Sequence, residues 1–149
     1  MVDLIKGFAK FHNEIYHHKQ ELFTKLARNQ EPQALFITCS DSRINPNLLT
    51  QTEPGDLFIL RNAGNLVPAY GAVIGGTTAT IEFGVSVLKV KEIIVCGHTD
   101  CGAMKALLHP ELNDLPAVRE WLRIAENTRR IMKEIYPDLK GGGTIFCDH

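Results

Sequence analysis

The sequence lacks the features that mark membrane, secreted and nucleic-acid-binding proteins. Its longest apolar stretches are far shorter than the roughly 20 residues that cross a bilayer. Its first twenty residues, "MVDLIKGFAKFHNEIYHHKQ", are too polar for a signal peptide. Neither charge predominates, since 16 basic residues face 17 acidic ones and no basic cluster stands out. We therefore expect a cytoplasmic protein with no membrane and no nucleic acid among its partners.

Signs of internal division and of nucleotide binding are also missing. No repeat, low-complexity tract or linker interrupts the 149 residues, so we predict a single domain over 1–149. No G-x-G-x-x-G or P-loop pattern follows a predicted strand, which argues against a nucleotide-binding domain. There are only four cysteines. In a reducing compartment these suggest metal binding or catalysis before disulfides.

The hydrophobic patterns that are present predict an α/β fold. Apolar residues at spacings of mostly three and four predict one amphipathic helix over 4–27. Short apolar runs bounded by turn residues predict strands at "ALFITC", "DLFIL" and "EIIVC", and "GGGTIFC" has the pattern of the beginning of another. Helices are expected within 75–90, after "CG" at 101–102, and over 116–135. This order of elements predicts a sheet covered by helices on both faces.

Sulfur and nitrogen ligands follow two of the predicted strands at the point where each ends. Cys39 closes the first strand in "ITCSDSR", and His98 and Cys101 follow the third in "IIVCGHTDCG". Ligands of open α/β sheets bind at the carboxyl ends of strands, so neighbouring strands would bring the three residues together. Zinc prefers these ligand types, and three of them leave a fourth position open for chemistry. The alternative is a strand-to-helix turn that carries sulfur without a metal.

Two charged residues lie beside the first of these cysteines. Asp41 and Arg43 are two positions apart and can form an ion pair if the turn brings them together. The guanidinium would keep the carboxylate ionised, so that it accepts a hydrogen bond from a metal-bound water without taking its proton. A turn-capping aspartate is an equally good interpretation of "SDS" taken alone.

The remaining cysteines and histidines carry weaker signals. We interpret Cys96 as a small buried hydrophobic residue at a strand end. Cys147 and His149 could bind metal, but a frayed tail is the preferred interpretation of "CDH". Three other histidines have no informative spacing and are expected in solvent: His17, His18 and His109.

Taken together, "CSDSR", "GDLFILRNAGNLVP" and "IIVCGHTDCGAMK" resemble the β-class carbonic anhydrases, and most of all their cyanobacterial branch associated with carboxysomes. The resemblance covers roughly residues 1 to 138. It implies a mostly parallel central sheet, a homodimer or higher homo-oligomer, and a cytoplasmic or carboxysome-associated location. It also implies a zinc lyase that reversibly hydrates CO2 to bicarbonate through a zinc-bound hydroxide.

The resemblance further assigns individual residues. It implies one zinc ion per chain on Cys39, His98 and Cys101. Asp41 and Arg43 match the family's catalytic pair, and in some members the aspartate becomes a fourth zinc ligand in an inactive, closed form. The positions that match the family's substrate-binding pocket are Gln30, Phe58, Ala63, Phe83 and Gly102.

The sequence also departs from the family pattern. Ala63 stands where a larger aliphatic residue is common, and Phe83 where tyrosine is common, which should alter the shape of the pocket. Phe36 replaces the tryptophan of the bicarbonate-inhibited branch, which argues against that allosteric site. The family's C-terminal helix and edge strand are not found after "GGGTIFCDH". We expect their absence to uncover apolar surface and to favour oligomerisation, lower stability or lower activity.

Two alternatives to a carbonic anhydrase follow from these departures. One is a hydrolase of CS2 or COS on the same scaffold, because both molecules are linear like CO2. The other is a catalytically impaired, shortened relative that serves as a binding or assembly module.

Overall fold

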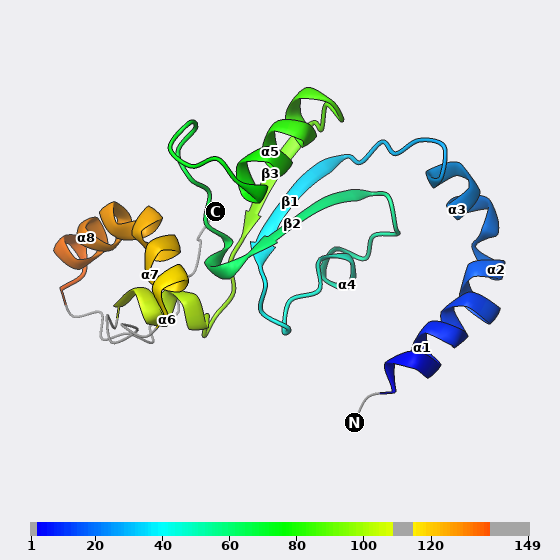
Figure 1. Ribbon diagram of the computed structural model, residues 1–149, viewed down its shortest axis with the longest axis horizontal. Helices are drawn as coiled ribbons and strands as arrows, with labels where there is room; N and C mark the ends of the chain where they lie inside the picture. Colours follow the sequence, from blue (N-terminus) through cyan, green and yellow to red (C-terminus); the bar gives the residue numbers. More distant parts are fainter. Residues whose placement is uncertain (1–2, 109–114, 138–149) are drawn as a thin grey trace.

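A computed structural model describes residues 3–108 and 115–137 of the chain. Its described part contains a sheet of three parallel strands in the order β2-β1-β3 (Figure 1). The strands are β1 (Ala34–Cys39), β2 (Leu57–Asn62) and β3 (Glu92–Cys96). The α/β fold is thus confirmed, and the first and third predicted strands are neighbours. The strand predicted at 141–147 lies outside the described residues.

The central strand β1 forms the core of the molecule. All six of its residues are buried, and Leu35 and Ile37 pack against Leu60 of β2. Thr38 is the one polar residue in this buried run, and its hydroxyl donates a hydrogen bond of 2.8 Å to the backbone carbonyl of Cys96. A buried hydroxyl without a partner would destabilise the fold, so this bond makes the run compatible with a central strand.

Short helices lie between and beyond the strands. The helix α4 (Pro46–Thr50) was not predicted, although it begins with a cap from the Asn45 side chain and with proline in its first turn. The helix α5 (Gly76–Ser86) packs on β2, where Gly84 lets it approach Phe58. The remaining elements beyond the carboxyl ends of the strands are η2 (Ala63–Asn65), α6 (Gly102–Leu108), α7 (Pro116–Leu122), η3 (Arg123–Ala125) and α8 (Glu126–Ile135).

The single N-terminal helix predicted over 4–27 is wrong in one respect, because the helix is broken. The segment comprises α1 (Leu4–Lys10), a π-helical turn η1 (Phe11–Ile15), α2 (Tyr16–His18) and α3 (Gln20–Leu26). The break falls at Lys19, within the polar run "HHKQE" that separates Ile15 from Leu22. The rings of Phe11 and Tyr16 pack on Phe23 across this break, with centroids 5.6 and 5.4 Å apart. The packing of these rings therefore favours a broken helix over the single straight helix that the sequence periodicity predicted.

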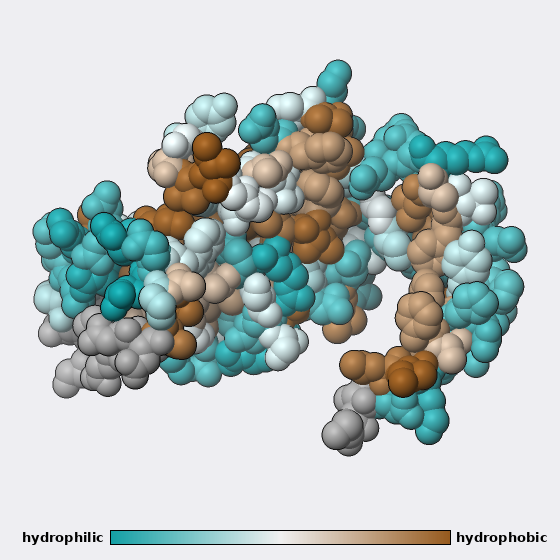
Figure 2. Space-filling model, in the orientation of Figure 1, coloured by the Kyte–Doolittle hydropathy of each residue, from teal (hydrophilic) through white to brown (hydrophobic). Residues whose placement is uncertain are grey.

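These N-terminal helices form an arm that stands away from the sheet (Figure 1). Figure 2 shows hydrophobic colouring along this arm. Its large apolar side chains include three that are at least 74% exposed: Leu4, Ile5 and Phe8.

The expected helical cover of both sheet faces is incomplete in the described part of the chain. Consecutive residues of β3 point to opposite faces of the sheet, yet Ile93, Ile94 and Val95 are all exposed, at 51%, 37% and 54%. None of the described helices is both long enough and apolar enough to cross a membrane.

We predict that Ile37→Ala lowers the free energy of unfolding by about 2–5 kcal/mol, because the truncation leaves a cavity in the core. Ile74→Ala is the matched control, since Ile74 is 99% exposed and its truncation should change stability by less than about 0.5 kcal/mol. Urea unfolding followed by circular dichroism measures both. Equal losses for the two variants would contradict the assignment of β1 to the core.

Candidate metal centre

Three side chains that could hold a metal ion converge at the carboxyl ends of β1 and β3. The Sγ atoms of Cys39 and Cys101 and a ring nitrogen of His98 all lie within 4.8 Å of one another. The two sulfur atoms are 3.8 Å apart, and both cysteines are buried free thiols. Parallel pairing of β1 with β3 aligns Thr38 with Cys96, so the residues that follow both strands meet at one sheet edge.

The His98 ring has a free nitrogen aimed into this group. Its Nδ1 lies 2.8 Å from the backbone carbonyl of Thr99. A carbonyl can only accept, so Nδ1 is the donor, and in the neutral ring Nε2 then presents a lone pair. Nε2 is buried and has no hydrogen-bond partner among the residues that the structure describes. A buried polar atom without a partner is costly, and a cation would satisfy it.

The environment of Cys39 favours its thiolate. Burial by itself raises the pKa of this thiol, but hydrogen bonds outweigh it, the largest from the backbone N–H of Gly64, and lower the pKa to about 7. The Gly64 nitrogen is 3.4 Å from Sγ. Gly64 has φ +77°, and a Cβ atom there would lie 2.5 Å from the Met104 side chain. The left-handed backbone is what favours glycine here, since the Met104 methyl group ends a flexible side chain and could move aside.

The second thiol is held differently. Burial is the main cause that raises the pKa of Cys101 above its ordinary value, and the neighbouring Cys39 also raises it. The Cys101 thiol lies 3.8 Å from the Cys39 sulfur and can donate a hydrogen bond to its thiolate, and a bound cation would favour loss of this second proton. Two sulfur ligands and one imidazole suit zinc.

Asp41 and Arg43 form the ion pair that the sequence suggested. The Arg43 Nε and Nη2 atoms donate to the two carboxylate oxygens of Asp41 at 2.9 and 2.7 Å. These hydrogen bonds are the main cause that holds the pKa of Asp41 far below its usual range. Asp41 Oδ2 also lies 3.8 Å from His98 Nε2. An ionised carboxylate, which can only accept hydrogen bonds, thus borders the three candidate ligands.

Sequence reasoning missed several residues that support this group. Arg61 donates from Nε to the Cys39 carbonyl at 3.0 Å and from Nη2 to the Asp41 carbonyl at 2.6 Å. Trp121 of α7 donates to the Ala63 carbonyl at 2.8 Å. The glycine after the second strand in "RNAGN" is the one local signal of a supporting contact, that of Gly64 with Cys39. The contacts of Arg61 and Trp121 join segments far apart in sequence.

The five residues predicted to line the pocket fall into two separate groups. Ala63 precedes Gly64 and Gly102 follows Cys101, so both adjoin the candidate ligands in sequence. Phe58 of β2 pairs with Leu35, which lies four positions before Cys39 on β1. At roughly 3.3 Å per residue, this puts Phe58 about 13 Å along the sheet from Cys39.

Phe83 and Gln30 belong to the group at the amino end of the sheet. Phe83 contacts Phe58, with ring centroids 6.0 Å apart. Gln30 precedes the first residue of β1 by four positions. Within one chain the structure therefore does not bring Gln30, Phe58 and Phe83 to the candidate ligands.

The other cysteine and histidines that the structure describes lie outside the group. Cys96 is partly exposed rather than buried, which corrects its interpretation as a core residue. His17 and His18 are exposed, as expected. His109, Cys147 and His149 lie outside the described residues.

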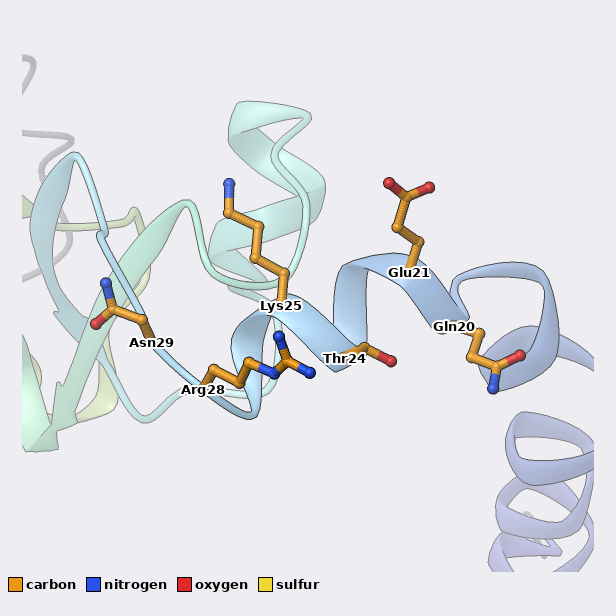
Figure 3. A pocket seen from close by; sticks show the side chains of 6 residues that line it. All are labelled: Gln20, Glu21, Thr24, Lys25, Arg28 and Asn29. Carbon is orange, nitrogen blue, oxygen red and sulfur yellow. The ribbon is translucent and has the colours of Figure 1, made fainter.

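A hollow of about 610 Å³ lies along α3 (Figure 3). None of the candidate ligands lines it. All of its lining residues have polar or charged side chains. The helix α3 leads into the amino end of β1, whereas Cys39 is at the carboxyl end. The lining residues are Gln20, Glu21, Thr24, Lys25, Arg28 and Asn29. This hollow carries none of the candidate chemistry.

Comparisons with known proteins agree with the geometry. A family model described as carbonic anhydrase matches residues 34–140. A carbonic anhydrase of Pseudomonas aeruginosa is 54% identical over 130 residues, 87% of this chain, and one of Synechocystis is 48% identical over 149 residues, 97% of this chain. The solved structure of the β-carbonic anhydrase CcaA matches with a TM-score of 0.90 and 48% identity, over 93% of this chain and 68% of that one.

This chain is shorter than its relatives. It spans 59% of the Pseudomonas protein and 54% of the Synechocystis protein. The similarity therefore covers the sheet and the candidate metal centre, but only part of each relative.

The unequal thiols lead to a pH prediction for metal-free protein. Because the folded-state pKa of Cys39 is lowered to about 7 and that of Cys101 is raised, one buried thiolate should appear as pH rises through about 7. Thiolate absorbance near 240 nm follows this step. Cys39→Ser should remove it, whereas Cys96→Ser should leave it in place. If the rise in thiolate absorbance near pH 7 remains in Cys39→Ser, the lowered pKa belongs to another thiol.

Proposed function

We propose, from the premise that this chain belongs to the β-carbonic anhydrase family, that it holds one zinc ion and catalyses the reversible hydration of CO2 to bicarbonate. Cys39, His98 and Cys101 would hold the ion, and Asp41 with Arg43 would act beside it. Alignment at 48–54% identity with proteins named carbonic anhydrase supports this function.

The observation that carries the proposal is the buried, unpartnered Nε2 of His98 beside two buried thiols. A hydrogen-bonded turn would leave no such atom without a partner. The donor set fits zinc in type, and within residues 3–108 and 115–137 it provides three protein ligands rather than the four of a structural site. When bound, zinc supplies the Lewis acidity that brings the pKa of water close to neutral.

Asp41 is suited to orient a proton-bearing nucleophile at this centre. Its Oδ1 accepts from the backbone and Nε nitrogens of Arg43, both at 2.9 Å, and its Oδ2 accepts from Nη2. Oδ2 is also the oxygen that faces His98. Because its pKa is strongly lowered, Asp41 stays ionised and accepts a hydrogen bond without removing the proton. It thereby directs the oxygen lone pair of the nucleophile toward CO2.

We further propose that a second copy of the chain completes the substrate pocket. Gln30, Phe58 and Phe83 match pocket positions, yet they lie at the opposite end of the sheet from Cys39. In a two-fold dimer each chain could give its amino-end residues to the metal centre of its partner. The 44% exposure of Phe83 in one copy is consistent with such a role.

The N-terminal arm supports association as well. Leu4, Ile5 and Phe8 are each at least 74% exposed on a helix that stands away from the sheet (Figure 2). An apolar patch of this kind is stabilised by covering it with another chain. We propose that the arm packs on a second copy, which makes the protein a homodimer or a higher homo-oligomer.

Removal of a ligand should abolish metal binding. We predict that Cys39→Ser and His98→Ala reduce zinc from one per chain to a small fraction and abolish CO2 hydration, because two remaining ligands hold the ion weakly. Cys96→Ser is the control and should retain both. Metal analysis and stopped-flow assays with CO2 and COS measure the effects. Full zinc in Cys39→Ser would exclude this centre, and COS hydrolysis without CO2 hydration would favour the alternative hydrolase.

The acceptor role of Asp41 can be tested separately. Asp41→Asn should keep zinc but lower the hydration rate roughly 10- to 100-fold, the worth of one charged hydrogen bond. An amide can donate as well as accept, so it no longer fixes the orientation of the nucleophile. Steady-state rates between pH 6 and 9 decide the matter. Wild-type rates at every pH would rule out the orienting role.

A shared pocket predicts complementation between two inactive chains. Cys39→Ser supplies an intact pocket, and a Gln30→Ala, Phe83→Ala double variant supplies an intact metal centre. Random mixing yields about half mixed dimers with one intact site of two, so activity should recover to about a quarter of wild type. Mixing Cys39→Ser with His98→Ala is the control and should restore nothing. No recovery in the first mixture would indicate a pocket within one chain.

A further inference from the structure

Asp100 lies between two of the candidate ligands, His98 and Cys101, in the loop that joins β3 to α6. Its backbone is left-handed, with φ +61°. Residues other than glycine, asparagine and aspartate adopt this conformation at a cost, so the backbone alone explains why one of these three is found here. It does not explain a carboxylate.

The Asp100 side chain and carbonyl both bind Arg43. Nη1 of Arg43 donates to Oδ2 of Asp100 at 3.1 Å, and Nη2 donates to its backbone carbonyl at 2.9 Å. The Nε and Nη2 edge of the same guanidinium binds Asp41. Arg43 is therefore held along two edges of its planar fork, by one aspartate from the loop after β1 and another from the loop after β3.

A second cation binds Asp100 at its other carboxylate oxygen. Lys105 of α6 forms an ion pair with Oδ1 of Asp100. The Lys105 hydrogen bond is the main cause that lowers the pKa of Asp100, followed by the hydrogen bond from Arg43. Four charges thus form a chain of ion pairs that alternate in sign, in the order Lys105, Asp100, Arg43, Asp41.

We propose that Asp100 is a positioning residue for Asp41, which it holds in place through Arg43. This inference rests on the function proposed above. Without the carboxylate of Asp100, only one edge of the guanidinium is bound by side chains, and Arg43 can turn away from Asp41. Asp41 Oδ2 is 3.8 Å from His98 Nε2, so a less restrained Asp41 can approach the candidate ligands instead of orienting the nucleophile.

Three variants separate the side chain of Asp100 from its backbone. Asp100→Gly keeps the left-handed conformation and the carbonyl acceptor but removes the carboxylate. Asp100→Asn keeps a neutral acceptor, and Lys105→Met removes only the supporting charge. These side chains are about half exposed, so each ion pair should contribute only as much as a pair on the protein surface. Asp100→Gly should therefore lower the hydration rate about 2- to 5-fold. Asp100→Asn and Lys105→Met should lower it by less. Glu120→Gln, which breaks an exposed pair with Arg123, is the matched control.

The readout that does not depend on activity is the guanidinium NMR spectrum of Arg43. In wild type its two Nη signals should be resolved, because rotation about the Nε–Cζ bond breaks hydrogen bonds to both aspartates. In Asp100→Gly they should broaden or merge, in zinc-loaded and in metal-free protein alike. Glu120→Gln should leave them resolved.

The outcomes distinguish this inference from the proposed function. Merged Arg43 signals together with a slower rate support it. Unchanged signals in Asp100→Gly overturn it, whatever the rate, because Asp100 then does not hold Arg43. If the glycine variant loses zinc, Asp100→Asn and Lys105→Met decide by the same signals. If wild-type protein is inactive but its Arg43 signals still depend on Asp100, the proposed carbonic anhydrase function is wrong. The inference that Asp100 holds Arg43 then still stands.

Discussion

The parallel pairing of β1 with β3 is the constraint on which the rest of the site depends. The two strands start together and β1 ends one residue after its last pair with β3, so Cys39 and the loop that carries His98 and Cys101 emerge at one edge. An antiparallel pairing, or a third strand inserted between them, would separate the ligands. The pairing is held by a fully buried central strand, whose one polar side chain, Thr38, bonds back to β3.

Packing and electrostatics then prepare the ligands. A left-handed glycine brings its N–H to the Cys39 sulfur, a backbone carbonyl fixes the His98 ring, and burial keeps water away from the thiols. The residues around the ligands are charged and more exposed, with Arg43 joining the two ligand loops through Asp41 and Asp100. The centre therefore combines a buried ligand set with an adjustable charged rim.

Local sequence signals were enough to predict the sheet and the convergence of the three candidate ligands, because both arise from short segments. "ALFITC" and "EIIVC" are strands over the predicted residues, and their strand-end cysteine and histidine positions converge. The failures come from long-range packing. The N-terminal helix is broken where Phe23 meets Phe11 and Tyr16, and the Asp100 contact joins residues 57 positions apart. The pocket residues, known only by resemblance, lie at two ends of the sheet, which no spacing within one chain reveals.

We propose that two thiolates and one imidazole hold a single zinc ion and leave one position for chemistry. X-ray absorption at the zinc edge tests this most directly on the purified protein. We predict two sulfur neighbours at about 2.3 Å and one histidine nitrogen at about 2.0–2.1 Å, with one further light-atom neighbour that changes when an inhibitory anion is added. Four sulfur neighbours, or zinc that stays fully coordinated by protein and insensitive to anions, would contradict it.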